Sequence, residues 1–170
     1  IDLDGVFSAS WSPTGKQIAF IGNNGGSSDI YLYDLDNNDY RQITDDIFSD
    51  SYPSWNKNGD KIVFVSDRGD YVDGKYGGRM EDHNYSQTDI YIVSTSDNKI
   101  RRLTFTPYNE NNPIWANTEN TIFYTSDYNG VHNLYRHSID ADNGMDNSLN
   151  PTAITNVLTG LQQPTISRDD

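Results

Sequence analysis

The chain has 170 residues, and 25 acidic against 12 basic residues give it a net charge of −13. Nearly all of the acids are Asp, while Ala and Leu, which favour helices, occur only five and eight times. This composition argues against an all-α fold and favours short strands joined by polar turns. The chain also lacks the clustered Lys and Arg that bind nucleic acid or anionic membrane surfaces, so we expect neither as a partner.

Apolar runs reach only four residues, as at 18–21 and 62–65, which is too short to span a bilayer or to form a signal peptide. We therefore expect no direct membrane insertion. The chain begins with Ile1 rather than Met, and we expect that a segment precedes it. Because there is no Cys, disulfides and thiolate metal sites are excluded.

Strand-like runs of aromatic and β-branched residues follow one another along the chain in groups of four. The first group lies around Trp11 and at 17–21, 30–33 and 40–44. The second lies around Trp55 and at 61–65, 90–93 and 99–104. The third lies around Trp115 and at 121–125, 134–137 and 152–155. Pro-Thr-Gly at 13–15 and Lys-Asn-Gly at 57–59 are typical of tight hairpin turns.

These groups form an internal repeat, because residues of the same kind recur at the same spacing. An aromatic residue follows each Trp by nine positions, and a Tyr and then a Thr mark two later positions. Trp11 and Trp55 are 44 residues apart, which sets the basic period. The second repeat carries 16 additional residues and the third carries seven, and Ile166 stands where a fourth repeat would have its Trp.

Four antiparallel strands in a unit of about 40–45 residues are typical of a β-propeller blade. We therefore expect an all-β fold, with residues 1–170 forming a partial β-propeller of four-stranded antiparallel blades. The blades are expected at about 5–44, 49–104 and 109–155, with the start of a fourth at 160–170. Because propellers close with about four to eight blades, we expect a fragment of a larger propeller. Self-association that closes the ring is the alternative.

Two features of the sequence predict how the blades are held together. The tryptophans Trp11, Trp55 and Trp115 occupy one position of the repeat, which predicts that they pack as core between blades. Asp67 and Arg68 follow directly after a strand, and for them we expect structural pairing rather than a functional role.

The segment 52–69, Tyr-Pro-Ser-Trp-Asn-Lys-Asn-Gly-Asp-Lys-Ile-Val-Phe-Val-Ser-Asp-Arg-Gly, resembles the repeat of the TolB-like propeller family. The segment Trp-Ser-Pro-Thr-Gly-Lys at 11–16 is similar to the same motif, whereas the third blade departs from it at its first turn. The resemblance implies a periplasmic or otherwise exported bacterial protein. It also implies a non-catalytic scaffold that binds protein partners in the cell envelope.

Two other functions remain open beside this one. The same repeat builds propellers attached to tricorn-like and prolyl-oligopeptidase-like peptidases, so the chain could be an accessory propeller whose catalytic domain lies elsewhere. A carbohydrate-binding propeller is the third candidate. The sequence contains no G-x-S-x-G, P-loop or H-E-x-x-H motif, and we expect no catalytic residue in this segment.

The 16 additional residues of the second repeat lie between its second and third strands, within 69–88. Up-and-down strands place this insertion on the same rim as Asp45, Asp46 and Asp50 and as 108–110. A loop rich in Tyr, with an Arg and a His, is typical of a partner contact. The predicted partner-binding residues are Tyr71, Tyr76, Arg79, His83 and Tyr85. A tolerated surface insertion without a role is the alternative.

The additional residues of the third repeat lie on the opposite rim. Asp140, Asp142 and Asp146 alternate around Gly144, as acidic ligands do at the start of a calcium loop. No Glu completes an EF-hand, and Asp and Asn are also ordinary turn residues. We expect no cofactor, with calcium at these three residues as the alternative.

Overall fold

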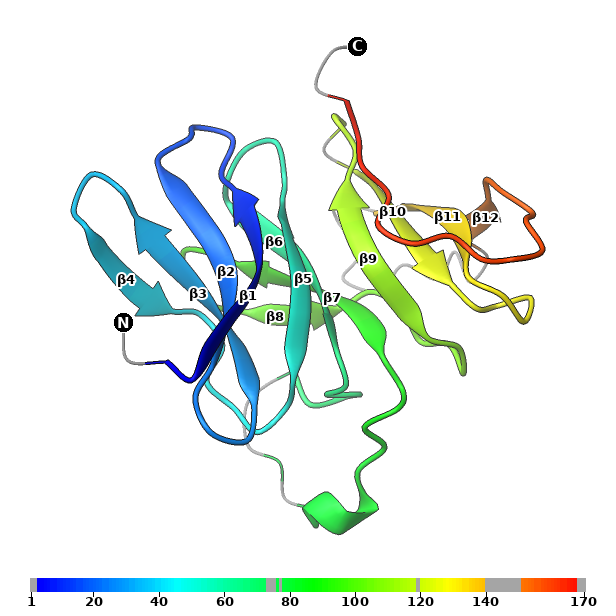
Figure 1. Ribbon diagram of the computed structural model, residues 1–170, viewed down its shortest axis with the longest axis horizontal. Coiled ribbons are helices and arrows are strands. Elements are labelled where there is room, and N and C mark those ends of the chain that lie inside the picture. The colour runs from blue at the N-terminus through cyan, green and yellow to red at the C-terminus, as the bar shows by residue number, and fades with distance from the viewer. Residues whose placement is uncertain (1–2, 73–75, 77, 119, 140–150, 168–170) are drawn as a thin grey trace.

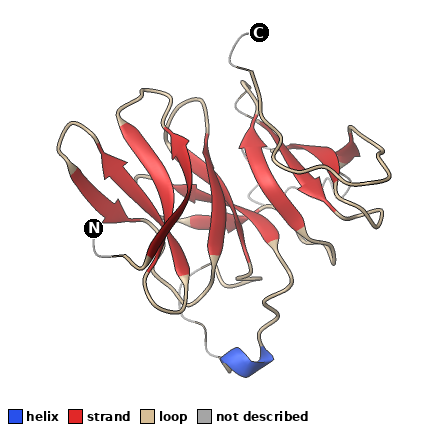
Figure 2. Cartoon of the chain, in the orientation of Figure 1, coloured by secondary structure: helices blue, strands red, loops and turns tan. Residues whose placement is uncertain are grey.

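Three four-stranded sheets make up the computed structural model, which describes residues 3–72, 76, 78–118, 120–139 and 151–167 (Figures 1 and 2). The first sheet consists of β1 (Gly5–Trp11), β2 (Gln17–Asn23), β3 (Ser28–Asp34) and β4 (Asp39–Gln42). The second consists of β5 (Asp50–Trp55), β6 (Lys61–Ser66), β7 (Asp89–Ser94) and β8 (Ile100–Arg102). The third consists of β9 (Glu110–Trp115), β10 (Thr121–Ser126), β11 (Asn133–Ser138) and β12 (Thr152–Ala153).

Each sheet follows simple up-and-down order, so that strands consecutive in sequence are also neighbours in the sheet. All of the pairings between neighbouring strands are antiparallel. This is the topology of a propeller blade, and the predicted all-β fold of four-stranded antiparallel blades is confirmed. Within the described residues, no helix is long and apolar enough to cross a membrane.

The first strand of each blade carries the same backbone irregularity. β1, β5 and β9 contact one another in chain order and form the inner edge of the assembly (Figure 1). Each contains a β-bulge, and a residue with positive φ stands three positions before the Trp: Ser8, Tyr52 and Asn112. Gln163, three positions before Ile166, has the same positive φ. The bulge is therefore a property of the repeat, which bends every inner strand at the same point.

Apolar side chains fill the two interfaces between consecutive blades. Trp55 is 7% exposed and packs among residues of the first and second blades. Its indole Nε1 also donates a hydrogen bond to the Ser10 carbonyl oxygen, at 3.1 Å. Trp115 is buried in the equivalent place between the second and third blades. In each case the Trp of one blade covers the face of the blade before it.

Trp11 does not follow the prediction that all three tryptophans are core residues. Its side chain is 55% exposed. The reason is geometric, because the Trp of each blade packs against the preceding blade and the described chain has none before the first. The expectation was correct for Trp55 and Trp115 and wrong for Trp11 in this chain.

The recurring Thr of the repeat has a backbone role. Thr44, Thr104 and Thr155 each accept, through Oγ1, a hydrogen bond from the backbone N–H of the third strand of their own blade. The distances are 2.8, 2.8 and 3.0 Å. The hydroxyl satisfies a buried donor at the point where the fourth strand leaves the sheet, which explains the spacing seen in sequence.

The expected start of a fourth blade forms no strand within the described residues 160–167. A strand needs a neighbour that satisfies its backbone groups, and the structure describes no second strand paired with this segment. The segment still lies beside the inner strands, because 163–165 line a hollow of about 300 Å³ together with β1, β5 and β9.

Candidate functional site

The insertion of the second blade leaves the sheet on the rim where the fourth strand of one blade connects to the first strand of the next. It carries the short 3-10 helix η1 (Met80–Asp82), which projects below the second blade in Figure 1. Both ends are fixed to the blade. The Tyr91 hydroxyl donates to the Gly69 carbonyl oxygen at 2.7 Å, and Gln87 Nε2 donates to the Tyr108 carbonyl oxygen at 2.6 Å.

Four of the five predicted partner-binding residues gather around Phe48, in the loop that connects the first blade to the second. Tyr71 is stacked on Phe48, and Tyr76 meets both rings edge-on, at centroid distances of 5.6 Å from Phe48 and 4.7 Å from Tyr71. His83 lies 5.2 Å from Phe48, and Tyr85 packs edge-on against His83 at 4.7 Å. We call these five residues the aromatic cluster.

The aromatic cluster has a buried base and an exposed outer surface. Phe48 is 1% exposed, whereas Tyr71 and Tyr85 are 42% and 58% exposed. Rings that pack on one another lose little further freedom when a partner covers them, which suits them to a contact surface. Arg79, the fifth predicted residue, is exposed and lies outside the cluster, and its carbonyl oxygen accepts a hydrogen bond from the Tyr76 hydroxyl at 2.9 Å.

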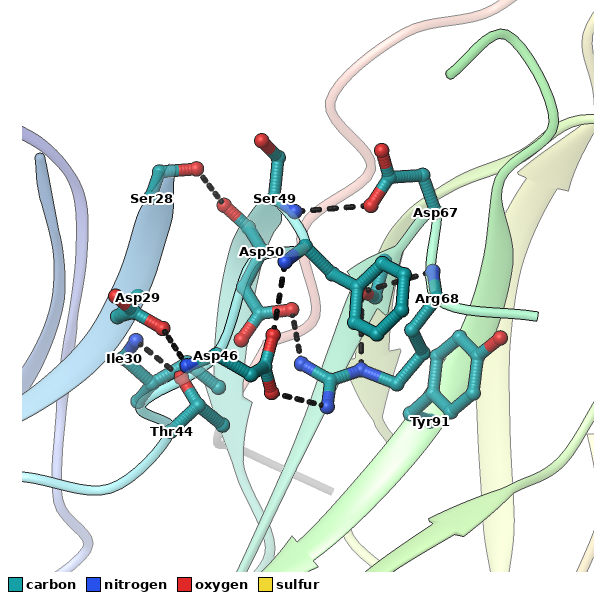
Figure 3. A network of polar contacts seen from close by, with 12 residues as sticks. Ser28, Asp29, Ile30, Thr44, Asp46, Ser49, Asp50, Asp67, Arg68 and Tyr91 are labelled. Carbon is teal, nitrogen blue, oxygen red and sulfur yellow. Dashed lines mark hydrogen bonds and ion pairs between the residues drawn. The ribbon is translucent and has the colours of Figure 1, made fainter. Parts of the chain in front are cut away.

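A buried arginine, Arg68, lies next to Phe48, and Figure 3 shows its ion pairs with Asp46 and Asp50. Arg68 pairs with Asp46 at 2.8 Å and with Asp50 at 2.6 Å, so that it joins the second blade to the end of the first. Its guanidinium carbon also lies 5.8 Å from the Phe48 ring centroid. Breaking a buried ion pair by removing one partner is strongly destabilising. The network therefore fixes the loop that carries Phe48.

Asp67 connects the same loop to the insertion. Its Oδ1 accepts a hydrogen bond from the Ser49 backbone N–H at 2.9 Å, and its Oδ2 lies 3.1 Å from His83 Nε2. In the third blade, Asp127 Oδ1 accepts a hydrogen bond from the equivalent backbone N–H, that of Asn109, at 2.8 Å. Asp67 and Arg68 thus have structural roles, as expected, but they do not pair with each other: Arg68 pairs with Asp46 and Asp50, and Asp67 contacts Ser49 and His83. In the second blade these contacts also position the predicted site.

A second arginine with the same surroundings lies at the end of β8. Arg102 pairs with Asp89 at 2.7 Å and with the exposed Asp70, at the start of the insertion. Its guanidinium carbon lies 4.4 Å from the centroid of Phe105, whose side chain is 57% exposed. Carboxylates and a ring face therefore enclose this cation as well.

The acidic residues expected on this rim differ in exposure. Asp45 is exposed, whereas Asp50 and Glu110 are almost completely buried. Burial raises the pKa of Glu110 to about 8, although hydrogen bonds from Thr104 and Thr106 oppose the shift. Burial, together with the nearby charge of Asp50, raises the pKa of Asp29 to about 7. Asp50 and Glu110 are thus parts of the framework rather than of a contact surface.

The calcium alternative cannot be placed, because Asp140, Asp142 and Asp146 lie outside the described residues. In the part of the chain that the structure does describe, no three His, Cys, Asp or Glu side chains are arranged to hold a metal ion.

Sequence reasoning missed Phe48 and Phe105. Both lie in loops that connect one blade to the next, outside the recurring positions of the repeat. Phe48 follows Thr44 by four positions, and Phe105 follows Thr104 by one. Because the two spacings differ, the repeat does not distinguish these aromatic residues from core residues.

Comparison with known proteins agrees with this architecture. Residues 3–73 match the family model described as TolB beta propeller domain. The Tol-Pal system protein TolB of Francisella tularensis subsp. mediasiatica (strain FSC147) is 27% identical over 136 residues, which cover 80% of this chain and 28% of that protein. The chain thus spans little more than a quarter of this curated relative. The predicted resemblance to the TolB-like propeller repeat is confirmed.

Solved structures show the same fold. TolB from Acinetobacter baumannii superposes with a TM-score of 0.66 and 21% identity, over 92% of this chain and 34% of that chain. A putative TolB from Agrobacterium tumefaciens superposes with a TM-score of 0.70 and 18% identity, over 91% of this chain and 50% of that chain. The tricorn protease superposes with a TM-score of 0.62 and 14% identity, over 84% of this chain and 14% of that chain.

Proposed function

We propose that this chain is a non-catalytic, TolB-like propeller scaffold that binds a protein partner in the bacterial cell envelope, and that the aromatic cluster is its contact surface. The observation that carries the proposal is the aromatic cluster itself. Exposed Tyr71 stacks on the buried Phe48, exposed Tyr85 packs on His83, and His83 in turn contacts Phe48. Ion pairs of Arg68 hold the loop that carries Phe48. A surface insertion without a role would not need such support.

The relatives support the setting of this function. The matching curated proteins are named as Tol-Pal system proteins, and an exported, periplasmic location follows if this chain shares their role. The acidic composition, with a net charge of −13, suits a soluble protein that stays away from anionic lipid surfaces.

Chemical crosslinking in envelope extract, followed by identification of the crosslinked residues, tests the proposal. Residues 70–85 are replaced by a short Gly-Ser turn, and residues 35–38 on the opposite rim are replaced in the same way as the control. We expect the partner to be lost with the first replacement and kept with the second. An unchanged set of crosslinked proteins after the first replacement would refute the role of the cluster.

An accessory propeller of a peptidase is the second candidate, because the tricorn protease and a puromycin-hydrolyzing peptidase of Mycobacterium tuberculosis share the fold, with TM-scores of 0.62 and 0.60. The chain covers only 14% and 22% of those proteins. Sequencing of the gene on both sides of this segment discriminates the two functions, since a Ser-His-Asp hydrolase domain would favour the second.

A further inference from the structure

The rim that carries the aromatic cluster combines exposed rings with exposed carboxylates. Tyr71, Tyr85 and Phe105 are each more than two-fifths exposed. The exposed acids in the same loops are Asp45, Asp70, Glu81 and Asp82. Among the described residues at this surface the cations are the buried Arg68, the exposed Arg79, and Arg102, which pairs with Asp70 and lies over Phe105; they are fewer than the carboxylates that surround them. The surface is therefore both apolar and negatively charged, which restricts what can bind to it.

The chain already binds its own arginines with this combination of groups. Arg68 lies 5.4–5.8 Å from three ring centroids and pairs with two carboxylates. Arg102 lies 4.4 Å from the Phe105 centroid and also pairs with two carboxylates. A planar guanidinium can stack on a ring and pair with a carboxylate at the same time, which a lysine ammonium does less well.

A hollow beside the cluster offers room for a further side chain. It has a volume of about 390 Å³ and lies between the end of the first blade and β8, with Val72 of the insertion at its edge. Ile43, Val72 and Ile100 give it apolar walls, and its charged lining residues are Asp45, Asp46, Arg68 and Lys99. Arg68 pairs with Asp46 and Lys99 pairs with Asp97, so Asp45 is the exposed carboxylate of the lining that a further cation would meet. The apolar stem of an arginine can lie along such walls while its charged end reaches a carboxylate.

We propose that the partner presents an arginine-rich segment to this rim. One arginine stem lies in the hollow, with its guanidinium at Asp45, and further guanidinium groups stack on the exposed faces of Tyr85 and Phe105. This inference rests on the proposed function, since it names the chemistry of the partner at the same surface. A neutral glycan could also stack on the rings, but it would gain nothing from the surrounding negative charge.

Fluorescence anisotropy with labelled 12-residue peptides tests the inference. The probes are four repeats of Gly-Ser-Arg, of Gly-Ser-Lys and of Gly-Ser-Glu. We expect the Arg peptide to bind about two- to fivefold more tightly than the Lys peptide, because stacking favours guanidinium. The Glu peptide should not bind. Equal affinity for the Arg and Lys peptides would show that only net charge is recognised, and would overturn the inference.

Two variants locate the binding, and each has a matched control on another surface. Asp45→Asn and Tyr85→Ser should each weaken binding of the Arg peptide about two- to fivefold. Asp39→Asn, the same charge change on the opposite rim, and Tyr40→Ser, at a partly exposed ring of β4, should leave it unchanged. Far-UV circular dichroism of all four variants checks that they keep their sheets.

The possible results distinguish a failure of the proposed scaffold function from a failure of the proposed arginine-rich segment. If the crosslinked partner requires residues 70–85 but no Arg peptide binds, the scaffold function stands and the arginine segment is refuted. If the Arg peptide binds equally to all four variants, the contact is nonspecific attraction to an acidic protein, and the site is refuted. If a neutral oligosaccharide competes at Tyr85 while Asp45→Asn has no effect, the surface binds glycan instead.

Discussion

Replacing Trp55 by Ala tests the arrangement of the blades, because the same repeat position supplies an internal control. Trp55 is 7% exposed and lies between the first and second blades, whereas Trp11 is 55% exposed and has no described blade to cover it. If each Trp stabilises the protein by covering the preceding blade, the two substitutions must differ strongly in their effect on the free energy of unfolding.

The magnitude follows from the buried surface. An aromatic side chain of this size buries roughly 200 Å², which at about 25 cal/mol per Å² corresponds to about 5 kcal/mol. The Ala that remains recovers part of this, and the cavity and the lost hydrogen bond from the indole Nε1 to Ser10 add to the cost. We expect about 3–5 kcal/mol for Trp55→Ala, and about half of that, roughly 1.5–2.5 kcal/mol, for Trp11→Ala, in proportion to its smaller burial.

Urea unfolding followed by far-UV circular dichroism measures both values without relying on tryptophan fluorescence. A loss for Trp11→Ala that equals or exceeds the loss for Trp55→Ala would refute the packing of each Trp against the preceding blade. A change within about 0.5 kcal/mol for Trp55→Ala would refute its place in the core.

Three further predictions concern the framework of the rim. Arg68→Met leaves the buried Asp50 and the partly buried Asp46 without their partner and should lower the free energy of unfolding by about 3–5 kcal/mol; a loss below about 1 kcal/mol in urea unfolding would contradict the pairing. Burial raises the pKa of Glu110 to about 8 in the folded state, well above its pKa of about 4.5 in the unfolded chain. Between these two pH values the folded state binds more protons than the unfolded state, so the free energy of unfolding falls as the pH rises from about 4.5 to about 8. Glu110→Gln should reduce this fall, as measured by unfolding at pH 5 and pH 9, and an identical pH dependence of the two proteins would be inconsistent with the buried carboxyl. Thr104→Val removes the acceptor of the Ile90 backbone N–H and should cost about 1–3 kcal/mol, with Thr152→Val, at an exposed position of β12, as a control expected to cost less than about 0.5 kcal/mol.

The repeat was enough to predict the blades, because residues that recur at the same spacing mark the same strand positions in each blade. The aromatic residue nine positions after the Trp is buried in all three blades, whereas the Trp itself is buried only where a described blade precedes it. The Thr hydroxyl accepts the same backbone N–H in all three blades. Periodicity therefore carried real information about the fold.

What the repeat could not predict depends on neighbours. The sequence cannot distinguish Trp11 from Trp55, since the two differ only in whether a blade precedes them. The same limit applies at 160–167, where the inner-strand backbone recurs at Gln163 without a second strand to pair with. Burial and pairing of a repeated unit are set by the adjacent unit.

The candidate site was predicted in composition but not in arrangement. Length and aromatic content identified the insertion, and Tyr71, Tyr76, His83 and Tyr85 do come together there. Phe48, around which they gather, lies in the connection from the previous blade. A contact between segments this far apart in sequence follows from the fold rather than from any local pattern.

Hydrogen–deuterium exchange with and without the crosslinked envelope partner tests the central claim most directly, because it locates the contact on the chain. We predict that the partner slows exchange in residues 45–50 and 78–88, which carry the base and the outer surface of the aromatic cluster. The turns at 13–16 and 57–60, on the opposite rim, should exchange at an unchanged rate. Protection confined to those turns, with none in residues 78–88, would contradict the assignment of this rim as the partner-binding surface.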